Sequence, residues 1–306
     1  MRLLLFIGLL ISYTSNVKAQ DPTTVLSANS IADSLSDIGD IRGAIELYKN
    51  MNAYDSANIF EVYNYACALA IDGQVDSAFK YLQIIVGRFF EVGTLFDPNL
   101  IHLHSDKRWK EIEEIIAKNT ESINGKFGNL YYAEKLWHLA ALDQAYYKEI
   151  NLAEEKVGER NTIVIALWDL KGKINKESVF ELEELIKKYG WPKNSDVKKD
   201  AARAAFFVIQ HSDLNTQKKY ISTIKNLCEQ KQADWESYAL MYDRIQVNEN
   251  KKQLYGSQVR YNTLTHKHEL FPIEDEKNVD IRREKVGLEP LTEYLLFYGI
   301  EYSLPK

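Results

Sequence analysis

The feature of this sequence that most constrains its fold is a repeat in its first half. The segment from Gly39 to Tyr48 resembles the segment from Gly73 to Leu82, at an offset of 34 residues. Residues of the same kind coincide at four pairs of positions: Gly39 and Gly73, Ile41 and Val75, Ala44 and Ala78, and Tyr48 and Leu82. A period of this length is typical of repeats built from paired helices. We therefore expect antiparallel helical hairpins in this half of the chain.

The second copy of the repeat carries a more complete pattern. Its apolar and small residues follow in the order Tyr63, Tyr65, Ala66, Leu69, Gly73, Ala78 and Leu82, and this order resembles the tetratricopeptide repeat. Two repeats are fewer than the roughly three that a solenoid needs, so another segment has to cap the stack. We expect this cap after Asp97, as a turn followed by an amphipathic helix with Trp109, Ile112 and Ile115 on one face.

The second half predicts another helical domain. The turn dipeptides Asn124-Gly125 and Gly128-Asn129 mark a linker. Helical patterns follow over residues 130–156, 162–170, 176–189, 200–210, 215–230, 234–247, 278–286 and 291–298. Alternating residues between Gln253 and Phe271 predict one short β-hairpin. The expected fold is therefore mainly α, with tetratricopeptide-like helical hairpins and a second helical domain that contains one short β-hairpin.

The N-terminus predicts export. Arg2 precedes the apolar run from Leu3 to Ile11, and Val17 and Ala19 are residues that signal peptidase accepts before its cleavage site. We expect a signal peptide over residues 1–19, a repeat module over 20–120 and a helical domain over 130–306. The apolar run is shorter than the roughly 20 residues of a membrane span. The product would be periplasmic or extracellular; the alternative is that the segment stays as an uncleaved anchor.

The charge distribution indicates which partner the repeat module would favour. Residues 20–125 contain 16 acidic and 8 basic side chains, whereas residues 126–306 contain 28 of each. An acidic surface favours a basic protein or peptide partner, and the overall charge of −6 argues against nucleic-acid binding. We expect an interaction or scaffold protein. The alternative for the repeat module is a purely structural brace for the second domain.

The two cysteines and the histidines give little sign of metal chemistry. Cys67 and Cys228 lie in apolar helical patterns, which favours buried free thiols over a disulfide between them. No Cys or His spacing indicates zinc, and His266 and His268 lie at the tip of the expected hairpin. We expect no metal and no cofactor.

A set of spaced motifs resembles a bacterial domain family of unknown function over about residues 130–300. The motifs are Gly190-Trp191-Pro192, Gln210-His211-Ser212-Asp213, Tyr238–Ile245, Gln253–Gln258, Pro272–Asp275, and Arg282-Arg283 with Gly287-Leu288. The resemblance implies a helical domain and names no activity. The family often shows Asp-Gln followed by an Arg early in the domain. This chain has Asp143-Gln144, but Tyr147 and Lys148 follow where the Arg is expected.

The candidate site consists of polar residues within these motifs. The candidate catalytic residues are His211, Asp243 and Arg244, and the candidate binding residues are Asp213, Gln253, Tyr255, Gln258 and Asp275. In an enzyme, His211 would be a general base oriented by Asp243, and Arg244 would hold an anionic or carbonyl-bearing group during hydrolysis or acyl transfer. No nucleophile motif accompanies them.

The same residues also fit two roles without chemistry. They could form a buried hydrogen-bond network in which Arg244 ties the loop of residues 272–275 to the helices, or they could line a non-catalytic binding pocket. The sequence leaves these alternatives open.

Overall fold

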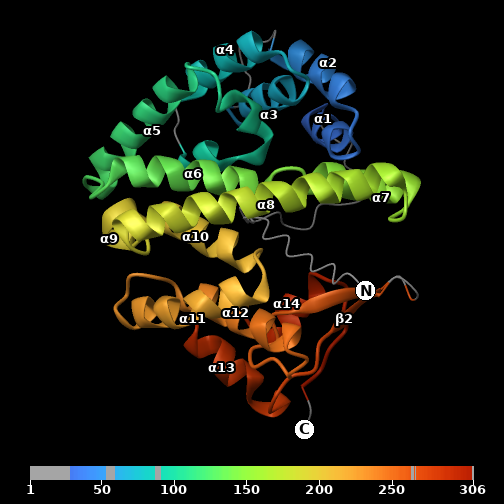
Figure 1. Cartoon of the computed structure of the whole chain (residues 1–306). Coiled ribbons are helices and arrows are strands. Elements are labelled where there is room, and N and C mark those ends of the chain that lie inside the picture. The colour runs from blue at the N-terminus through green and yellow to red at the C-terminus, as the bar shows by residue number, and fades with distance from the viewer. Residues whose placement is uncertain (1–27, 53–58, 87–90, 263–264, 266, 305–306) are drawn as a thin grey trace. The chain divides into compact units, whose positions relative to one another are not determined.

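A computed structural model describes residues 28–52, 59–86, 91–262, 265 and 267–304. Within these ranges the chain forms fourteen α-helices, three short 3-10 helices and one two-stranded antiparallel sheet (Figure 1). The predicted fold class, mainly α with one short β-hairpin, is confirmed. The predicted signal peptide (residues 1–19) lies outside the described residues.

The chain divides into two compact units, and the division falls within α10, between Val208 and Ile209. The helices up to this point are α1 (Ala28–Asp37), α2 (Ile41–Asn52), α3 (Ile59–Ile71), α4 (Val75–Val86), η1 (Val92–Phe96), η2 (Pro98–Leu103), α5 (Trp109–Asn124), α6 (Leu130–Gln144), α7 (Tyr147–Val157), α8 (Thr162–Tyr189), α9 (Asn194–Val197) and α10 (Lys199–Gln210). After it come α11 (Leu214–Glu229), α12 (Trp235–Asn248), β1 (Val259–Asn262), β2 (Lys267–Leu270), η3 (Glu276–Asn278), α13 (Val279–Lys285) and α14 (Leu291–Leu296). We call these the N-terminal and C-terminal units.

The first four helices form two pairs whose turns repeat each other. At the end of α1, the N–H of Asp40 donates to the carbonyl of Leu35 at 2.8 Å; 34 residues later, the N–H of Gln74 donates to that of Leu69 at 2.9 Å. The glycine before each donor, Gly39 or Gly73, has a φ of +85° or +78°. This left-handed conformation at a helix end strongly favours glycine. The sequence repeat is therefore also a repeat of backbone geometry.

Packing within these pairs follows the same offset. The side chains of Ala44 and Ala78 are both 0% exposed, and the larger Tyr48 and Leu82, one turn further along α2 and α4, are also buried. A methyl side chain lets two helices approach closely, and the large residue one turn away fills the space beside it. Helix α2 packs on both α1 and α3, and α3 packs on α4.

The segment after the helix pairs differs in one detail from the prediction. Trp109 and Ile112 on α5 are buried as expected, but Ile115 is 38% exposed and Ile116 is buried instead. Positions i, i+3 and i+7 share one face of a helix, so Ile116 rather than Ile115 continues the face that begins at Trp109. Helix α5 packs on α4 and on η1.

Two other helix predictions are wrong. The helix expected over residues 130–156 breaks at Tyr146, whose φ of +73° is incompatible with a continuous helix, and becomes α6 and α7. The two helices expected over 162–170 and 176–189 form one 28-residue helix, α8, because Gly172 is tolerated in its interior. Helix α8 packs along both α6 and α7 (Figure 1), and this packing outweighs the weak helix propensity of the glycine.

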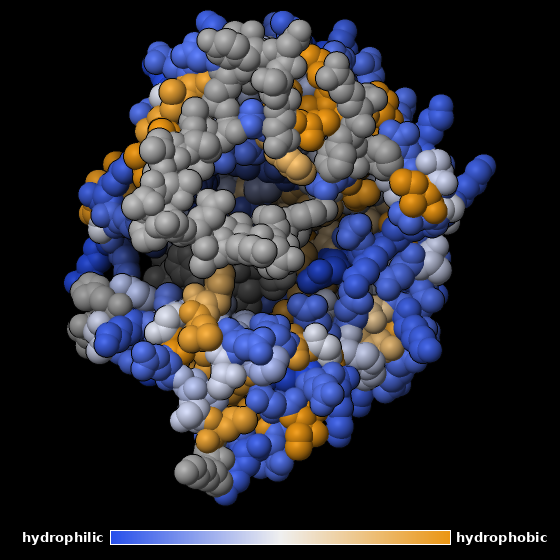
Figure 2. All heavy atoms as spheres, turned by 180° about the vertical axis from the view of Figure 1, so that it is seen from behind, coloured by the Kyte–Doolittle hydropathy of each residue, from blue (hydrophilic) through white to orange (hydrophobic). Residues whose placement is uncertain are grey.

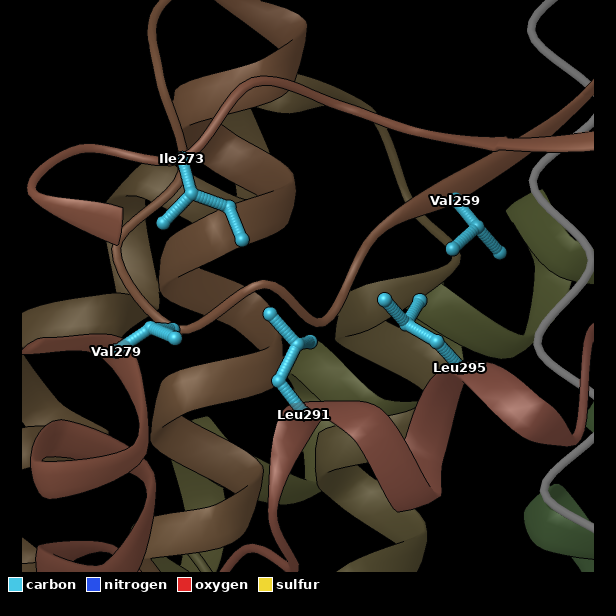
Figure 3. Packing of buried hydrophobic residues seen from close by; sticks show 5 residues of the cluster. All are labelled: Val259, Ile273, Val279, Leu291 and Leu295. Atoms are coloured by element: carbon cyan, nitrogen blue, oxygen red, sulfur yellow. The ribbon is translucent and has the colours of Figure 1, made fainter. Parts of the chain in front are cut away.

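The C-terminal unit combines the helix pair α11 and α12 with the hairpin. The hairpin pairs Val259 with Leu270 and Asn262 with Lys267, so its strands are shorter than the alternating sequence pattern. Figure 3 shows part of the core: Val259 and Ile273 lie close to Val279, Leu291 and Leu295 from the last two α-helices. This cluster joins segments that are separated by more than thirty residues of sequence.

Cys67 and Cys228 are both buried free thiols, as the sequence predicts. In the described part of the chain, no helix has the length and apolar character of a membrane span. On the face shown in Figure 2, hydrophilic residues predominate among the coloured atoms, and apolar residues form separate small groups.

Gly256 offers a test of packing in the C-terminal unit. Its φ is +70°, and a Cβ atom there would lie 2.8 Å from the Cδ1 atom of Ile273 and 2.9 Å from that of Leu291. We expect Gly256→Ala to lower the free energy of unfolding by about 2–4 kcal/mol, from backbone strain and overpacking. Gly287→Ala is the control, because Gly287 also has a positive φ but has open space around it. Equal losses in chemical denaturation of the two variants would contradict the packing argument.

Candidate functional site

The polar residues that the sequence singled out converge on the loop from Gln253 to Gln258. Asp243, on α12, is fully buried. Its Oδ1 atom accepts hydrogen bonds from the N–H groups of Leu254 at 2.7 Å and Tyr255 at 3.0 Å. Its Oδ2 atom accepts from the N–H groups of Tyr255 and Ser257 and from the Ser257 hydroxyl, each at 3.0–3.1 Å. One carboxylate therefore satisfies three backbone donors of this loop.

The carbonyl groups of the same loop are bound by side chains from the end of the chain. The Arg282 Nε atom donates to the carbonyl of Leu254 at 2.8 Å, and the Arg283 Nη1 atom donates to that of Tyr255 at 2.8 Å. The Tyr294 hydroxyl donates to the carbonyl of Ser257 at 2.7 Å. Buried backbone groups of a loop without regular structure need partners outside a helix or sheet ladder, and these side chains supply them here.

Gln253 and Gln258 close the loop on itself. The N–H of Gln258 donates to Gln253 Oε1 at 2.8 Å, and Gln253 Nε2 donates back to the carbonyl of Gln258 at 3.1 Å and to that of Phe271 at 2.8 Å. The side-chain amide of Gln253 thus forms hydrogen bonds of the kind that a neighbouring strand would form, and it connects the loop to Phe271. Both glutamines are fully buried.

Arg244 lies beside this network and is only 4% exposed. Its Nη1 atom donates to the carbonyl of Gln210 at 3.0 Å, and its Nε atom lies 3.4 Å from Gln258 Oε1. The predicted tie to the loop of residues 272–275 is made by Arg282, whose Nη2 atom donates to the carbonyls of Glu274 at 2.6 Å and Asp275 at 2.9 Å. Arg244 instead links the end of α10 to the loop.

The other candidate residues lie at the edge of this network or apart from it. Asp213 caps α11, with its Oδ1 atom accepting from the N–H groups of Asn215 and Thr216. Asp275 is more than half exposed and pairs with Arg282 at 3.3 Å. Tyr255 is half-buried, with its ring 6.2 Å from that of Tyr242. His211 is half-buried just after the end of α10.

Burial and hydrogen bonding act in opposite directions on Asp243. Burial raises the pKa of its carboxyl group, and the N–H donors of the loop oppose this by stabilising the charged form. The net direction is a raised pKa. Both oxygens already accept at least two hydrogen bonds, so the geometry suits a carboxylate that organises a loop. The network also uses Ser257, Arg282 and Arg283, for which the sequence predicts no role.

A second buried polar contact lies in the N-terminal unit, and the sequence did not predict it. Lys171 on α8 is buried, and its Nζ atom donates to the carbonyls of Leu142 at 2.8 Å and Asp143 at 2.6 Å, at the end of α6. It also lies 4.6 Å from the centre of the Tyr147 ring. Burial lowers the pKa of Lys171 to about 8. In the sequence, Lys171 shares a helix face with Val164, Ser178 and Leu185, and this position is the signal for its burial.

Two surface depressions lie away from this network, on α6 and α8. One of about 510 Å³ lies between α6 and α8, and another of about 520 Å³ lies along α8. Tyr131, Leu185 and Tyr189 line the first and Phe180 lines the second, together with lysines and glutamates. Neither contains a predicted site residue. In the residues that the structure describes, no three His, Cys, Asp or Glu side chains are grouped so that they could hold a metal ion.

Residues 133–305 match the model of a family of unknown function, DUF6624, so the chain belongs to this family. The match confirms the predicted domain of unknown function and covers more than half of the chain. No curated protein and no solved structure matches the chain.

The hydrogen bonds of Asp243 predict that the substitution Asp243→Asn strongly destabilises the fold. Asp243→Asn replaces an acceptor by an NH₂ group that would face backbone N–H donors. We expect the free energy of unfolding to fall by about 3–5 kcal/mol, because buried donors lose their acceptor. Asp275→Asn, on the exposed side of the network, should cost less than about 1 kcal/mol. Urea denaturation of both variants measures this, and a stable Asp243→Asn variant would contradict the assigned role.

Lys171 predicts a pH dependence of stability. Its pKa is about 8 in the folded chain and about 10.4 in an unfolded chain. Between these values the unfolded state holds the proton that the folded state has released, so stability rises with pH. Relative to Lys171→Met, the parent chain should gain about 1.4 kcal/mol per pH unit from pH 8 to pH 10. Lys173→Met, an exposed change on the same helix, should show no such trend.

Proposed function

We propose that this chain is an exported protein-interaction or scaffold protein whose two N-terminal helix pairs bind a protein or peptide partner. The repeated turn geometry at an offset of 34 residues carries the proposal. Helix pairs of this kind, including tetratricopeptide repeats, form extended surfaces that bind other proteins. The signal-like first nineteen residues support export to the periplasm or the extracellular space.

One side of the helix pairs is occupied by the chain itself. Lys148 on α7 pairs with Asp37 at 3.0 Å, and Lys156 donates to the carbonyl of Ile38 at 3.1 Å. On α3, the Tyr63 hydroxyl donates to Asp97 at 2.6 Å. These contacts fix α1 and α3 against the rest of the N-terminal unit. They favour the exposed sides of α2 and α4 as the surface for a partner.

The charges of the helix pairs support a basic partner. The described residues 28–52 and 59–86 contain seven acidic and three basic side chains. Some of the acids are engaged within the chain, for example Asp72 with Arg42 and Asp76 with Arg108. Glu46 on α2 is exposed, and Ile84 on α4 is 41% exposed. An exposed apolar side chain on helix pairs that carry more acids than bases suits a basic segment that carries an apolar residue.

The alternative is a hydrolase or acyl-transfer enzyme that uses His211, Asp243 and Arg244. The enclosure of Asp243 and Arg244 favours the network interpretation, because a catalytic group has to reach the reacting atoms. Purified chain and its His211→Ala variant, assayed with ester and amide substrates, decide this point. Turnover by the parent chain that is lost in His211→Ala would contradict the interaction proposal and support the enzyme.

The partner surface is tested by a double substitution, Glu46→Lys with Ile84→Ser. Crosslinking of the full-length chain in its host, followed by mass spectrometry, identifies the captured protein, and calorimetry with the purified pair measures affinity. We expect the double variant to bind at least about tenfold more weakly, because it loses an apolar contact and reverses one charge. Binding by the parent chain should weaken as salt is added.

The matched control is Glu159→Lys with Ile163→Ser, which makes the same changes at the start of α8, where Ile163 is 58% exposed. This control should bind as the parent does. A control that loses affinity equally, or a parent chain that captures no saturable partner, would contradict the proposal.

A further inference from the structure

Two histidines in the N-terminal unit face each other at hydrogen-bond distance. His104 follows η2, and His138 lies on α6; their Nδ1 atoms are 2.9 Å apart. The His104 ring stacks on Trp109, the first residue of α5, with 4.1 Å between the ring centres. The pair therefore joins the segment of η2 and α5 to α6.

The geometry of the contact restricts its protonation state. Two Nδ1 atoms can share a hydrogen bond only when one carries a proton and the other does not. The Nε2 atom of His104 is buried and has no hydrogen-bond partner among the described residues. A second charge on the pair would place two N–H groups against each other and leave the Nε2–H of His104 without an acceptor, which is costly in a buried site.

The helices α5, α6 and α8 carry charged side chains near the pair, and two of them, Lys135 and Glu181, act electrostatically on His138. Lys110 on α5 lies 3.7 Å from Glu113 on the same helix and 2.6 Å from Glu134 on α6. Lys135 on α6 lies 3.7 Å from Glu181 on α8. For His138, Glu181 raises the pKa and Lys135 lowers it. These side chains pair with one another, so an added proton on the histidines finds no unpaired carboxylate in this set.

We propose that His104 and His138 form an acid-sensitive latch that holds η2 and α5 against α6, and that uptake of protons by the pair releases this segment. The released segment connects the helix pairs to the rest of the N-terminal unit, so the latch would make their attachment depend on pH. This inference does not depend on the identity, or the existence, of a partner.

The pKa directions agree with the geometry. Burial, and then the neighbouring His138, lowers the pKa of His104 to about 3, and burial also lowers that of His138. Both values lie below the unfolded value of about 6.5. As pH falls below 6.5, the open or unfolded chain takes up protons that the closed latch excludes, so stability falls with pH. His104 multiplies the opening equilibrium about tenfold per pH unit between its lowered pKa and pH 6.5, and His138 acts in the same direction.

The test compares hydrogen exchange of the full chain at pH 7 and pH 4, corrected for the intrinsic rate. We expect residues 98–124 to lose protection at pH 4 while α8 keeps it. The increase of the opening equilibrium constant between pH 7 and pH 4 should be at least about tenfold smaller in His104→Phe and in His138→Gln. The phenyl ring that His104→Phe introduces can still stack on Trp109. His102→Gln is the control, because His102 is exposed beside the pair, and it should behave as the parent does.

Two results would overturn the latch. One is a loss of protection in residues 98–124 that is equal in the parent and in both histidine variants, which would assign the acid effect to carboxylates such as Glu113. The other is a simultaneous loss across residues 98–124 and α8, which would mean global unfolding. If His104→Phe does not fold, His138→Gln alone decides between these outcomes, because an amide can still accept or donate one hydrogen bond at this position.

Discussion

The C-terminal unit depends on one buried carboxylate. Asp243 provides the acceptors for three backbone N–H groups of the loop from Leu254 to Ser257. Without them the loop would carry unsatisfied donors into the interior, at a cost of about 1–3 kcal/mol for each group. The loop in turn places Gly256 against Ile273 and Leu291 and leads into β1, so the hairpin and the last two helices pack on a backbone that Asp243 holds in place.

This arrangement brings segments that are far apart in the sequence together at one loop. The motif with Asp243 supplies acceptors, the motif with Arg282 and Arg283 supplies donors, and the motif from Gln253 to Gln258 is the loop that both of them bind. Such a set has a structural purpose without any chemistry, because a buried network is stable only when all its members are satisfied. The contacts of these residues therefore account for a defined loop and require no catalytic role.

The N-terminal unit relies on a different kind of constraint. Its helix pairs use small residues, left-handed glycine turns and large apolar side chains at the same offset, and its polar contacts, such as the pair of His104 and His138, join segments that the repeats do not reach. Lys171 plays a similar part where α8 crosses the end of α6. In this unit, buried polar groups connect one helix to another, whereas the periodic apolar residues of the sequence account for the helices themselves.

The sequence by itself determined the helical character of most segments, the repeat and the hairpin, because periodicity, glycine turns and alternation are local properties that each segment carries. It also singled out Asp243, Arg244, Gln253 and Gln258, which are buried, but it grouped them with His211, Asp213, Tyr255 and Asp275, which are half-buried or exposed. Only the tertiary structure decided that α8 is continuous, that α6 and α7 separate at Tyr146, that Arg282 rather than Arg244 holds the loop of residues 272–275, and that His104 meets His138. These outcomes depend on contacts between distant segments, whose distances no local pattern encodes.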